Sequence, residues 1–300
     1  MRKQDDLHAR ITAKIIAAIE SNPGKPTMPW RRSQGATQWP CNALTHKQYN
    51  GINVVLLWAE AQQRGFNSNL WASYKQWQEL GGQVRAGEKA SDIVFFKASS
   101  VEPDPDKEDD DGQRLVARSY AVFNACQVDN FAIPGKPDID LGPIERIANA
   151  DAFVKNTGAK IEHHGQRAFY RPSTDSITVP EEKLFEGTAT MNRDEAYYAV
   201  LLHETVQWTG VEKRCNREFG RRFGDSSYAA EELVAEIGSA LLCCELGITQ
   251  DTREDHAKYI ASWLALMKSD KKAIFTASAK ASEAVTYLQK LQPGEMQMAA

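Results

Sequence analysis

The sequence predicts an α+β protein with two domains, and three observations support this. Eight segments repeat apolar residues every three or four positions, as amphipathic helices do, and five shorter segments have the composition of strands. Residues 132–144 contain three prolines and two glycines, which is typical of a linker. The length of 300 residues also suits roughly two domains of about 150 residues. We therefore expect domains at 1–131 and 145–300, joined by the linker at 132–144.

The first domain is expected to combine helices with a pair of strands. Leu7 and Ile11 begin an apolar repeat at helical spacing, which stops before Pro23 and Gly24. The acidic run at 102–112 has almost no apolar side chains, so we expect a solvated loop or hairpin tip inserted between two strands. The elements predicted here are helices at 5–21, 53–64 and 74–80 and strands at 92–97 and 115–123.

The second domain is expected to place a small sheet before a helical bundle. Its short strands follow one helix, and long apolar repeats of helical period fill the rest of the chain. The predicted elements are a helix at 143–157, strands at 159–163, 167–171 and 176–179, and helices at 193–210, 228–246, 254–268 and 270–291.

The charge of the chain is divided unevenly along its length. The net charge of −4 and the isoelectric point near 5.9 argue against a nucleic-acid partner when the whole chain is averaged. Residues 1–100, however, contain 13 Lys and Arg against 7 Asp and Glu, a net charge of +6, whereas the remainder has a net charge of −10. A basic first third beside an acidic remainder indicates binding to nucleic acid or to another anionic surface.

Neither membrane insertion nor secretion is expected for this chain. No stretch of about 18 apolar residues suits a transmembrane helix, and residues 1–10 lack the apolar segment of a secretory signal. The five cysteines are scattered without a Cys-x-x-Cys pair, which argues against a disulfide framework and against a thiolate zinc site. We therefore expect a cytoplasmic protein with no membrane partner.

The segment HETVQWTG at 203–210 indicates a metal site on a helix. In His-Glu-x-x-His the two histidines share one helical face and bind zinc, while the glutamate activates the bound water. Here His203 and Glu204 are present, and Gln207 stands at the position of the second histidine. An amide oxygen reaches the same place but is a weaker zinc ligand than imidazole. An exposed polar pair on a helix surface is the alternative interpretation.

Two carboxylates on the next helix can complete such a site. Glu232 and Glu236 are four residues apart and therefore share a helical face. Either can act as the remaining ligand while the other accepts the second N–H of His203, and Glu231 is expected to point elsewhere. A solvated acidic face is the alternative, although the apolar neighbours favour burial, where a carboxylate needs a partner. We expect Zn²⁺ or another divalent cation such as Mn²⁺ in this site.

The first domain also has the residue types of a nucleic-acid surface. Binding of single strands without sequence specificity needs cations for the phosphates and aromatic faces for the bases, and residues 25–97 contain five of the seven tryptophans beside many lysines and arginines. Asn53 is expected to cap the helix after the turn at 49–53, where free N–H groups can hold a phosphate; an ordinary capped turn is the alternative. The predicted DNA contacts are Trp30, Arg31, Arg32, Tyr49, Asn53, Lys75, Arg85 and Lys89.

These motifs together resemble the ArdC family of antirestriction proteins, which conjugative plasmids specify. HETVQWTG is similar to the family's H-E-L-x-H-W-T-G, and YAAEELVAE at 228–236 is similar to its Y-A-R-E-E-L-V-A-E helix. In the first half, residues 49–53, 81–85 and 120–124 match the family pattern, so the resemblance spans nearly the whole chain. It implies an α/β domain that binds single-stranded DNA, followed by a zincin-like metallopeptidase domain.

The resemblance also implies roles for individual residues. His203 corresponds to a metal ligand, Glu204 to the general base, Glu232 to the third protein ligand, and Glu236 to a residue that orients the histidine. Gln207 departs from the family pattern, which has histidine at this position. Three interpretations stay open: the amide binds the metal weakly, a water replaces it, or this member works without hydrolysis.

Two further features of the second domain are candidates for a role in hydrolysis. Tyr228 can stabilise an oxyanion if its hydroxyl faces the metal, and a packed aromatic in the first helical turn is the alternative. The strand at 167–171 can present its edge to an extended peptide, by analogy with other peptidases.

Three functions are consistent with the sequence. The first is an antirestriction protein that binds incoming single-stranded DNA without sequence specificity and shields it, or its duplex product, from host restriction. The second is an active zinc metallopeptidase that cleaves a host restriction protein or a DNA-bound protein. The third is a noncatalytic DNA-binding scaffold that a metal stabilises. Gln207 in place of histidine favours the first and the third.

Overall fold

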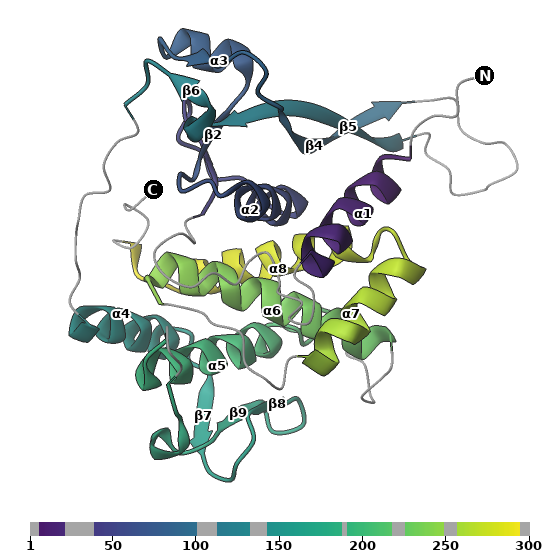
Figure 1. The fold of residues 1–300 in the computed structure, drawn as a ribbon. Helices are drawn as coiled ribbons and strands as arrows, with labels where there is room; N and C mark the ends of the chain where they lie inside the picture. Colours follow the sequence, from purple (N-terminus) through teal and green to yellow (C-terminus); the bar gives the residue numbers. More distant parts are fainter. Residues whose placement is uncertain are drawn as a thin grey trace, which may run out of the picture.

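The computed structural model describes residues 6–21, 39–100, 113–132, 143–187, 191–217, 226–248 and 257–294. Within these ranges the fold is α+β, as predicted. Figure 1 shows a long β-hairpin at the top, two helices of the first half beneath it, then helices of the second half, and a small sheet at the bottom. The predicted acidic insertion at 102–112 and most of the predicted linker lie outside the described residues.

The first half has three helices, and each begins or ends on a local signal. Asp6 accepts a hydrogen bond from the backbone N of Ala9 at the start of α1 (3.2 Å). Ser73 and Gln76 form a capping box at α3. Gly65 adopts a left-handed conformation (φ 68°) after α2. The bounds are α1 Leu7–Glu20, α2 Ile52–Arg64 and α3 Tyr74–Glu79, which confirms the three predicted helices.

Two sheets accompany these helices. A four-stranded sheet has the order β1-β2-β5-β4, and a two-stranded sheet pairs β3 with β6. The bounds are β1 Cys41–Asn42, β2 Leu70–Ala72, β3 Gln83–Val84, β4 Ser91–Ser100, β5 Gln113–Asn124 and β6 Val128–Asp129. The two long strands were predicted, and the four short ones were not, because two or three residues show no periodicity and pairing with distant segments defines them.

The role predicted for Asn53 is wrong. Gly51, not Asn53, is the N-cap of α2, and the Asn53 side chain is buried inside the first helical turn. Its Nδ2 donates to the carbonyl of Val94 (2.9 Å), and its Oδ1 accepts from the N–H of Val94 (2.7 Å). Asn53 therefore satisfies the backbone of β4 and attaches that strand to α2.

The second half begins with a helix and a small sheet, and four helices follow. The sheet order is β7-β9-β8, with β7 parallel and β8 antiparallel to β9. Asn192 and Glu195 form a capping box at the start of α5. The bounds are α4 Pro143–Asn156, β7 Lys160–His163, β8 Phe169–Arg171, β9 Ser176–Val179, α5 Arg193–Trp208, α6 Ser226–Leu246, α7 Ala257–Ser269 and α8 Ala273–Lys290. Every predicted element of this half is present.

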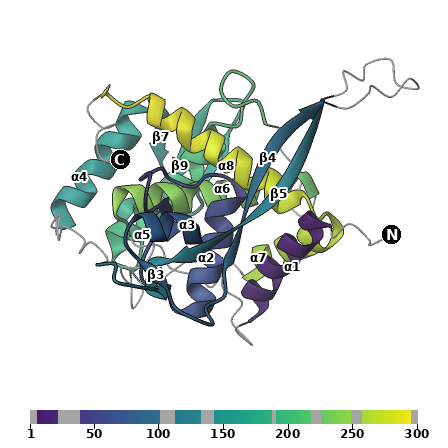
Figure 2. The same ribbon diagram turned by 90° about the horizontal axis from the view of Figure 1, so that it is seen from above.

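One continuous hydrophobic core joins the two halves of the chain. It contains Ile11 of α1 and Leu57 of α2 together with residues of α5, α6 and α8. Thr12 donates to the carbonyl of Lys271 (2.7 Å), and the N–H of Gly51 donates to Ser282 (3.0 Å). Both views place α1 and α2 next to the C-terminal helices (Figures 1 and 2). None of the helices in the described ranges is long and apolar enough to span a bilayer.

Candidate metal centre and nucleic-acid interface

Two helices bring the predicted metal ligands together. His203 and Gln207 lie one turn apart near the end of α5, and Glu232 lies near the start of α6. His203 Nε2 is 3.4 Å from Glu232 Oε2 and 3.3 Å from Gln207 Nε2, and Gln207 Nε2 donates to Glu232 Oε1 (2.9 Å). The three predicted ligands, an imidazole, a carboxylate and an amide, therefore lie next to one another.

A glycine sets the distance between these two helices. Gly238 of α6 faces Val206 of α5, and a Cβ atom at position 238 would lie 2.9 Å from Val206 Cγ1. A larger residue would force Val206 or the helix backbone to shift, because that separation is shorter than a normal van der Waals contact. Gly238 thus allows the ligands of α5 and α6 to converge.

The neighbouring residues of α6 separate into two groups. Glu236 faces the other ring nitrogen, with His203 Nδ1 3.8 Å from its Oε2. Tyr228 makes a hydrogen bond with the carboxylate of Glu232, so its hydroxyl lies at the metal site and orients a predicted ligand. Glu231 turns away, as predicted, and pairs with the buried Arg217.

Glu204 is buried beside this cluster. Its side chain is 6% exposed, and its Oε2 atom has no hydrogen-bond partner among the residues that the structure describes. Burial raises the pKa of Glu204 to about 7. A hydrogen bond from the backbone N–H of Tyr170 in β8 acts in the other direction and lowers this pKa. A carboxylate with a pKa near neutrality can take up and release a proton, as a general base must.

Three carboxylates control the protonation of His203. Burial disfavours the charged ring, but the hydrogen bond to Glu232 and the charges of Glu232, Glu204 and Glu236 outweigh it and raise the pKa of His203 to about 9. The pKa of Glu232 is lowered, because its bonds with His203, Tyr228 and Gln207 outweigh the effect of burial. Without metal, the ring and Glu232 therefore form an ion pair at neutral pH.

The donor set fits a divalent cation. Ligand atoms placed tetrahedrally around zinc at normal bond lengths lie about 3.4 Å apart, and the two distances from His203 Nε2 are 3.4 and 3.3 Å. The Gln207 amide presents its nitrogen to this point, so a half-turn of the amide is needed before its oxygen can bind. No group of three His, Cys, Asp or Glu in the described part of the chain is placed to hold a metal, so Gln207 decides whether this centre has a third protein ligand.

A polar clamp holds β8 against α5. Asp175, in the turn between β8 and β9, accepts hydrogen bonds from Lys213 (2.7 Å), from the Tyr170 hydroxyl (2.7 Å) and from Arg214. Arg214 also donates to the carbonyl of Trp208, the last residue of α5 (2.6 Å). The clamp therefore keeps Tyr170 next to Glu204.

Replacing Asp175 with asparagine should weaken the clamp most at neutral pH. Hydrogen bonds hold the pKa of Asp175 well below its ordinary value of 3.8. The largest effect comes from Arg214, and Lys213 and Tyr170 add to it. The stabilisation is thus present above pH 3.8 and is lost as the pH falls through the lower folded-state pKa. We expect D175N to lose about 1 kcal/mol of unfolding free energy at pH 7, because the pair is partly solvated, and to flatten the fall below pH 4. Urea titrations over pH measure this, and an equal loss in the exposed control Glu212→Gln would contradict it.

The predicted DNA contacts do not form one exposed surface. Trp30, Arg31 and Arg32 lie outside the described residues. Tyr49 is buried, with 8% exposure, so the prediction that it is a surface contact is wrong. The Asn53 side chain, with 7% exposure, is bound to the backbone of Val94. The Tyr49 carbonyl accepts a hydrogen bond from Trp39, and its hydroxyl accepts one from Asn42, because this turn is packed into the core.

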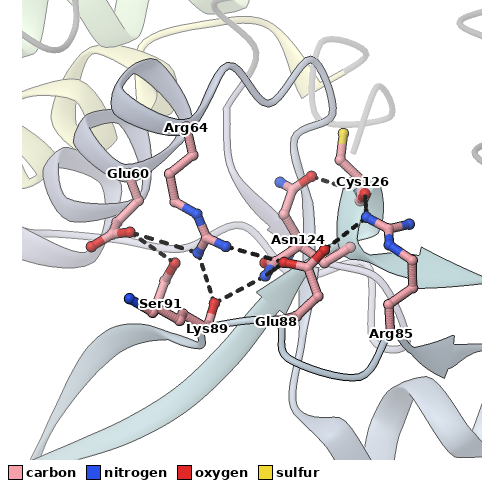
Figure 3. A network of polar contacts seen from close by, with 9 residues as sticks. Glu60, Arg64, Arg85, Glu88, Lys89, Ser91, Asn124 and Cys126 are labelled. Carbon is pink, nitrogen blue, oxygen red and sulfur yellow. Dashed lines mark hydrogen bonds and ion pairs between the residues drawn. The ribbon is translucent and has the colours of Figure 1, made fainter.

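The three remaining predicted contacts belong to exposed residues. Lys75 and Lys89 are exposed. Arg85 is exposed too, but its guanidinium pairs with Glu88 (2.9 Å) and donates to the carbonyl of Cys126 (Figure 3). It also pairs with Asp129 (3.4 Å). A phosphate would have to compete with these carboxylates for Arg85.

Glu88 is the centre of this network. It also pairs with Arg64 of α2 (3.3 Å) and accepts a hydrogen bond from Gln127 (2.9 Å), while Arg64 donates to the carbonyl of Lys89 (2.7 Å) (Figure 3). The network ties the end of α2 to the loop before β4. Glu88 and Arg64 therefore attach this loop to the helix.

Several residues at these sites were missed by the sequence analysis. Arg217 and Arg214 are far from their partners in sequence, and no local signal identified them. The aromatic residues Phe95 and Tyr120 are 51% and 49% exposed on the long hairpin. Strand alternation, which places residues two apart on one face, could have identified this pair.

Comparisons with known proteins agree with this two-part organisation. Residues 5–124 match a family model for the N-terminal domain of the anti-restriction factor ArdC, and residues 148–280 match one for a zincin-like metallopeptidase. The uncharacterized protein y4eC of Sinorhizobium fredii is 41% identical over 288 residues, covering 94% of this chain and 91% of the relative. The DNA primase TraC of Escherichia coli is 33% identical over 316 aligned positions, which span 99% of this chain and 21% of TraC.

Solved structures extend the similarity to three dimensions. The crystal structure of the antirestriction protein ArdC from plasmid R388, in its metal-free form, has a TM-score of 0.74 and 37% identity, covering 95% of this chain and 97% of that one. The Mn(II)-bound form has a TM-score of 0.74 and 38% identity, covering 95% and 98%. Both halves of this chain are thus found, in the same order, in one solved protein.

Proposed function

This chain belongs to the ArdC family of antirestriction proteins, and from that premise we propose that it binds single-stranded DNA without sequence specificity and protects plasmid DNA entering a host cell from restriction. The observation that carries the proposal is the match to R388 ArdC over 95% of this chain and 97% of that structure. The net charge of +6 in residues 1–100 supports a polyanionic partner. Duplex DNA formed after entry is a second ligand in this proposal, and the site of action is the cytoplasm.

We further propose that the second half holds a divalent cation, Zn²⁺ or Mn²⁺, through His203, Glu232 and Gln207. The distances between these side chains and the Mn(II)-bound form of R388 ArdC support this. A bound cation of this type polarises carbonyl groups and lowers the pKa of water. Tyr228 and Glu236 hold Glu232 and the His203 ring in place.

Peptide hydrolysis is the second candidate function, and Glu204 favours it. The Oε2 atom of Glu204, which has no hydrogen-bond partner among the residues that the structure describes, and the pKa of about 7 are suited to moving a proton beside the metal ligands. The target would be a host restriction protein or another DNA-bound protein. Gln207 argues for the third possibility, a noncatalytic scaffold, because its amide nitrogen, which is not a metal ligand, faces this site and donates to Glu232 (2.9 Å).

Replacing Glu204 with glutamine separates these functions. The change keeps the shape of the buried side chain and removes its ability to accept a proton. If protection comes from DNA binding, we expect plasmid transfer into a restricting host to be the same with E204Q and with the unmodified chain. If hydrolysis is required, losing the base would slow it by about 10²- to 10⁴-fold, and protection would fail.

The measurement is transfer efficiency into restricting and non-restricting recipients. The matched control is Glu186→Gln, an isosteric change at an exposed glutamate of the same half. Loss of protection in E204Q but not in E186Q would contradict the DNA-binding mechanism. In parallel, the purified full chain must bind a labelled single-stranded oligonucleotide, and failure to do so at low salt would overturn the proposed function itself.

A further inference from the structure

Two aromatic rings lie exposed on the long hairpin. Phe95 of β4 and Tyr120 of β5 are 51% and 49% exposed, and both are among the exposed large hydrophobic residues of the described chain. Their ring centroids are 5.4 Å apart with an interplanar angle of 83°, so they form an edge-to-face pair. The pair is therefore a fixed apolar feature on the surface.

Two cations share this face of the hairpin. Phe95 stands directly opposite Arg118, and Ile93 directly opposite Tyr120, so these four residues point to the same side. Lys97, two residues beyond Phe95, also points there. Both Lys97 and Arg118 are exposed. Within the described part of the chain, neither makes an ion pair.

Four other cations near this part of the fold are already engaged. Asp92, on the opposite face of β4, pairs with Arg10 (3.1 Å) and Lys14 (2.7 Å) of α1. Arg85 and Arg64 pair with Glu88. Lys97 and Arg118 are therefore better placed to bind an external anion, because no carboxylate of the described residues has to be displaced.

The opposite face of the hairpin anchors it. Besides the pairs of Asp92, Phe96 packs near His8 of α1 (centroids 6.3 Å apart) and near Phe275 of α8 (6.5 Å). Asn53 holds the backbone of Val94. Figure 2, which looks down on the hairpin, shows β4 and β5 crossing over the helices and extending away from α3. The side that bears Phe95 and Tyr120 is thus supported by contacts behind it, and on that same side Ile93, two residues before Phe95, is buried (4% exposed).

We propose that the face formed by Phe95, Lys97, Arg118 and Tyr120, here called the hairpin platform, is where the chain binds single-stranded DNA. This rests on the function proposed above and assigns it a surface. The rings offer faces on which unpaired bases stack. Lys97 and Arg118, on the same two strands, can bind the phosphates of the DNA backbone. A duplex keeps its bases stacked inside, so the platform discriminates in favour of single strands.

Two single variants, Phe95→Ala and Tyr120→Ala, test the platform. The full chain is titrated into a fluorescein-labelled oligo(dT), and binding is followed by fluorescence anisotropy. Because stacking on an aromatic side chain contributes about 1–3 kcal/mol for each base, we expect Kd to rise by about fivefold or more for Phe95→Ala or Tyr120→Ala. The Phe95→Trp variant, which keeps a stacking surface, should bind like the unmodified chain. Both rings are exposed, so the fold should be retained, and circular dichroism checks this.

The charges are tested separately through salt dependence. Replacing Lys97 and Arg118 together with glutamine should reduce the slope of log K against log salt by about 1.4, since each phosphate contact with a single strand contributes about 0.7. The matched control is Tyr74→Ala, which removes an aromatic residue with 44% exposure on α3, away from the platform. It should leave both Kd and the salt slope unchanged.

The outcomes separate the platform from the proposed function. If the unmodified chain binds oligo(dT) and the ring variants bind equally well, the platform is wrong while DNA binding stands. If the unmodified chain does not bind oligo(dT) at low salt, the proposed function fails. The platform would also be wrong if the ring variants lost as much affinity for duplex DNA as for oligo(dT). It would be wrong as well if the ring variants changed the oligomeric state, measured by light scattering, without changing Kd. Tighter binding to oligo(U) than to oligo(dT) would assign the platform to RNA instead.

Discussion

Replacing Arg217 with methionine is expected to destabilise the protein by about 3–5 kcal/mol, because it leaves a buried carboxylate without a partner. Arg217 and Glu231 are only 8% and 6% exposed, and they are joined by contacts of 2.7 and 3.0 Å. Arg217 also donates to the carbonyl of Val206 and to Thr209 (both 2.8 Å), so it caps the end of the helix that bears His203. Urea unfolding followed by circular dichroism measures the loss.

Two further variants make this prediction specific. Adding Glu231→Leu to R217M removes the unpaired charge and should recover most of the lost stability, since an apolar pair can replace a buried ion pair. Lys280→Met breaks an exposed pair with Glu283 (side chains 41% and 47% exposed) and should cost less than about 1 kcal/mol. Equal losses for R217M and K280M would show that burial does not determine the effect.

Replacing Gln207 with histidine is expected to tighten zinc binding by at least about tenfold, because imidazole is a better zinc ligand than an amide. The change also removes the amide nitrogen that lies between His203 Nε2 (3.3 Å) and Glu232 Oε1 (2.9 Å). Metal affinity is measured by competition with a chromophoric chelator at fixed pH, since protonation of His203 competes with the metal.

Gln207→Ala distinguishes the interpretations of this position. If the amide oxygen is a weak ligand, Q207A binds zinc less tightly than the unmodified chain. If the amide nitrogen obstructs the metal, Q207A binds more tightly. His203→Ala should abolish specific binding in either case. Unchanged affinity in Q207H would show that α5 and α6 do not present position 207 to the metal.

The local signals of the sequence predicted most of the fold. The helices follow from apolar repeats, and the spacing of His203, Gln207, Glu232 and Glu236 predicted which side chains share a helical face. The orientation of Glu231 also followed from helical geometry. The DNA surface was predicted less well, because composition does not distinguish a core tyrosine such as Tyr49 from an exposed one such as Tyr120.

The sequence by itself determined that this chain has a basic first third and, in its second half, two helices that each present a pair of polar side chains. Only the tertiary structure decided which carboxylate meets which nitrogen of His203, that the Gln207 amide nitrogen donates to Glu232, and that Phe95 and Tyr120 are exposed. The physical reason is that helical faces depend on neighbours a few residues apart. The approach of α5 to α6, and the covering of one hairpin face, depend on packing between distant segments.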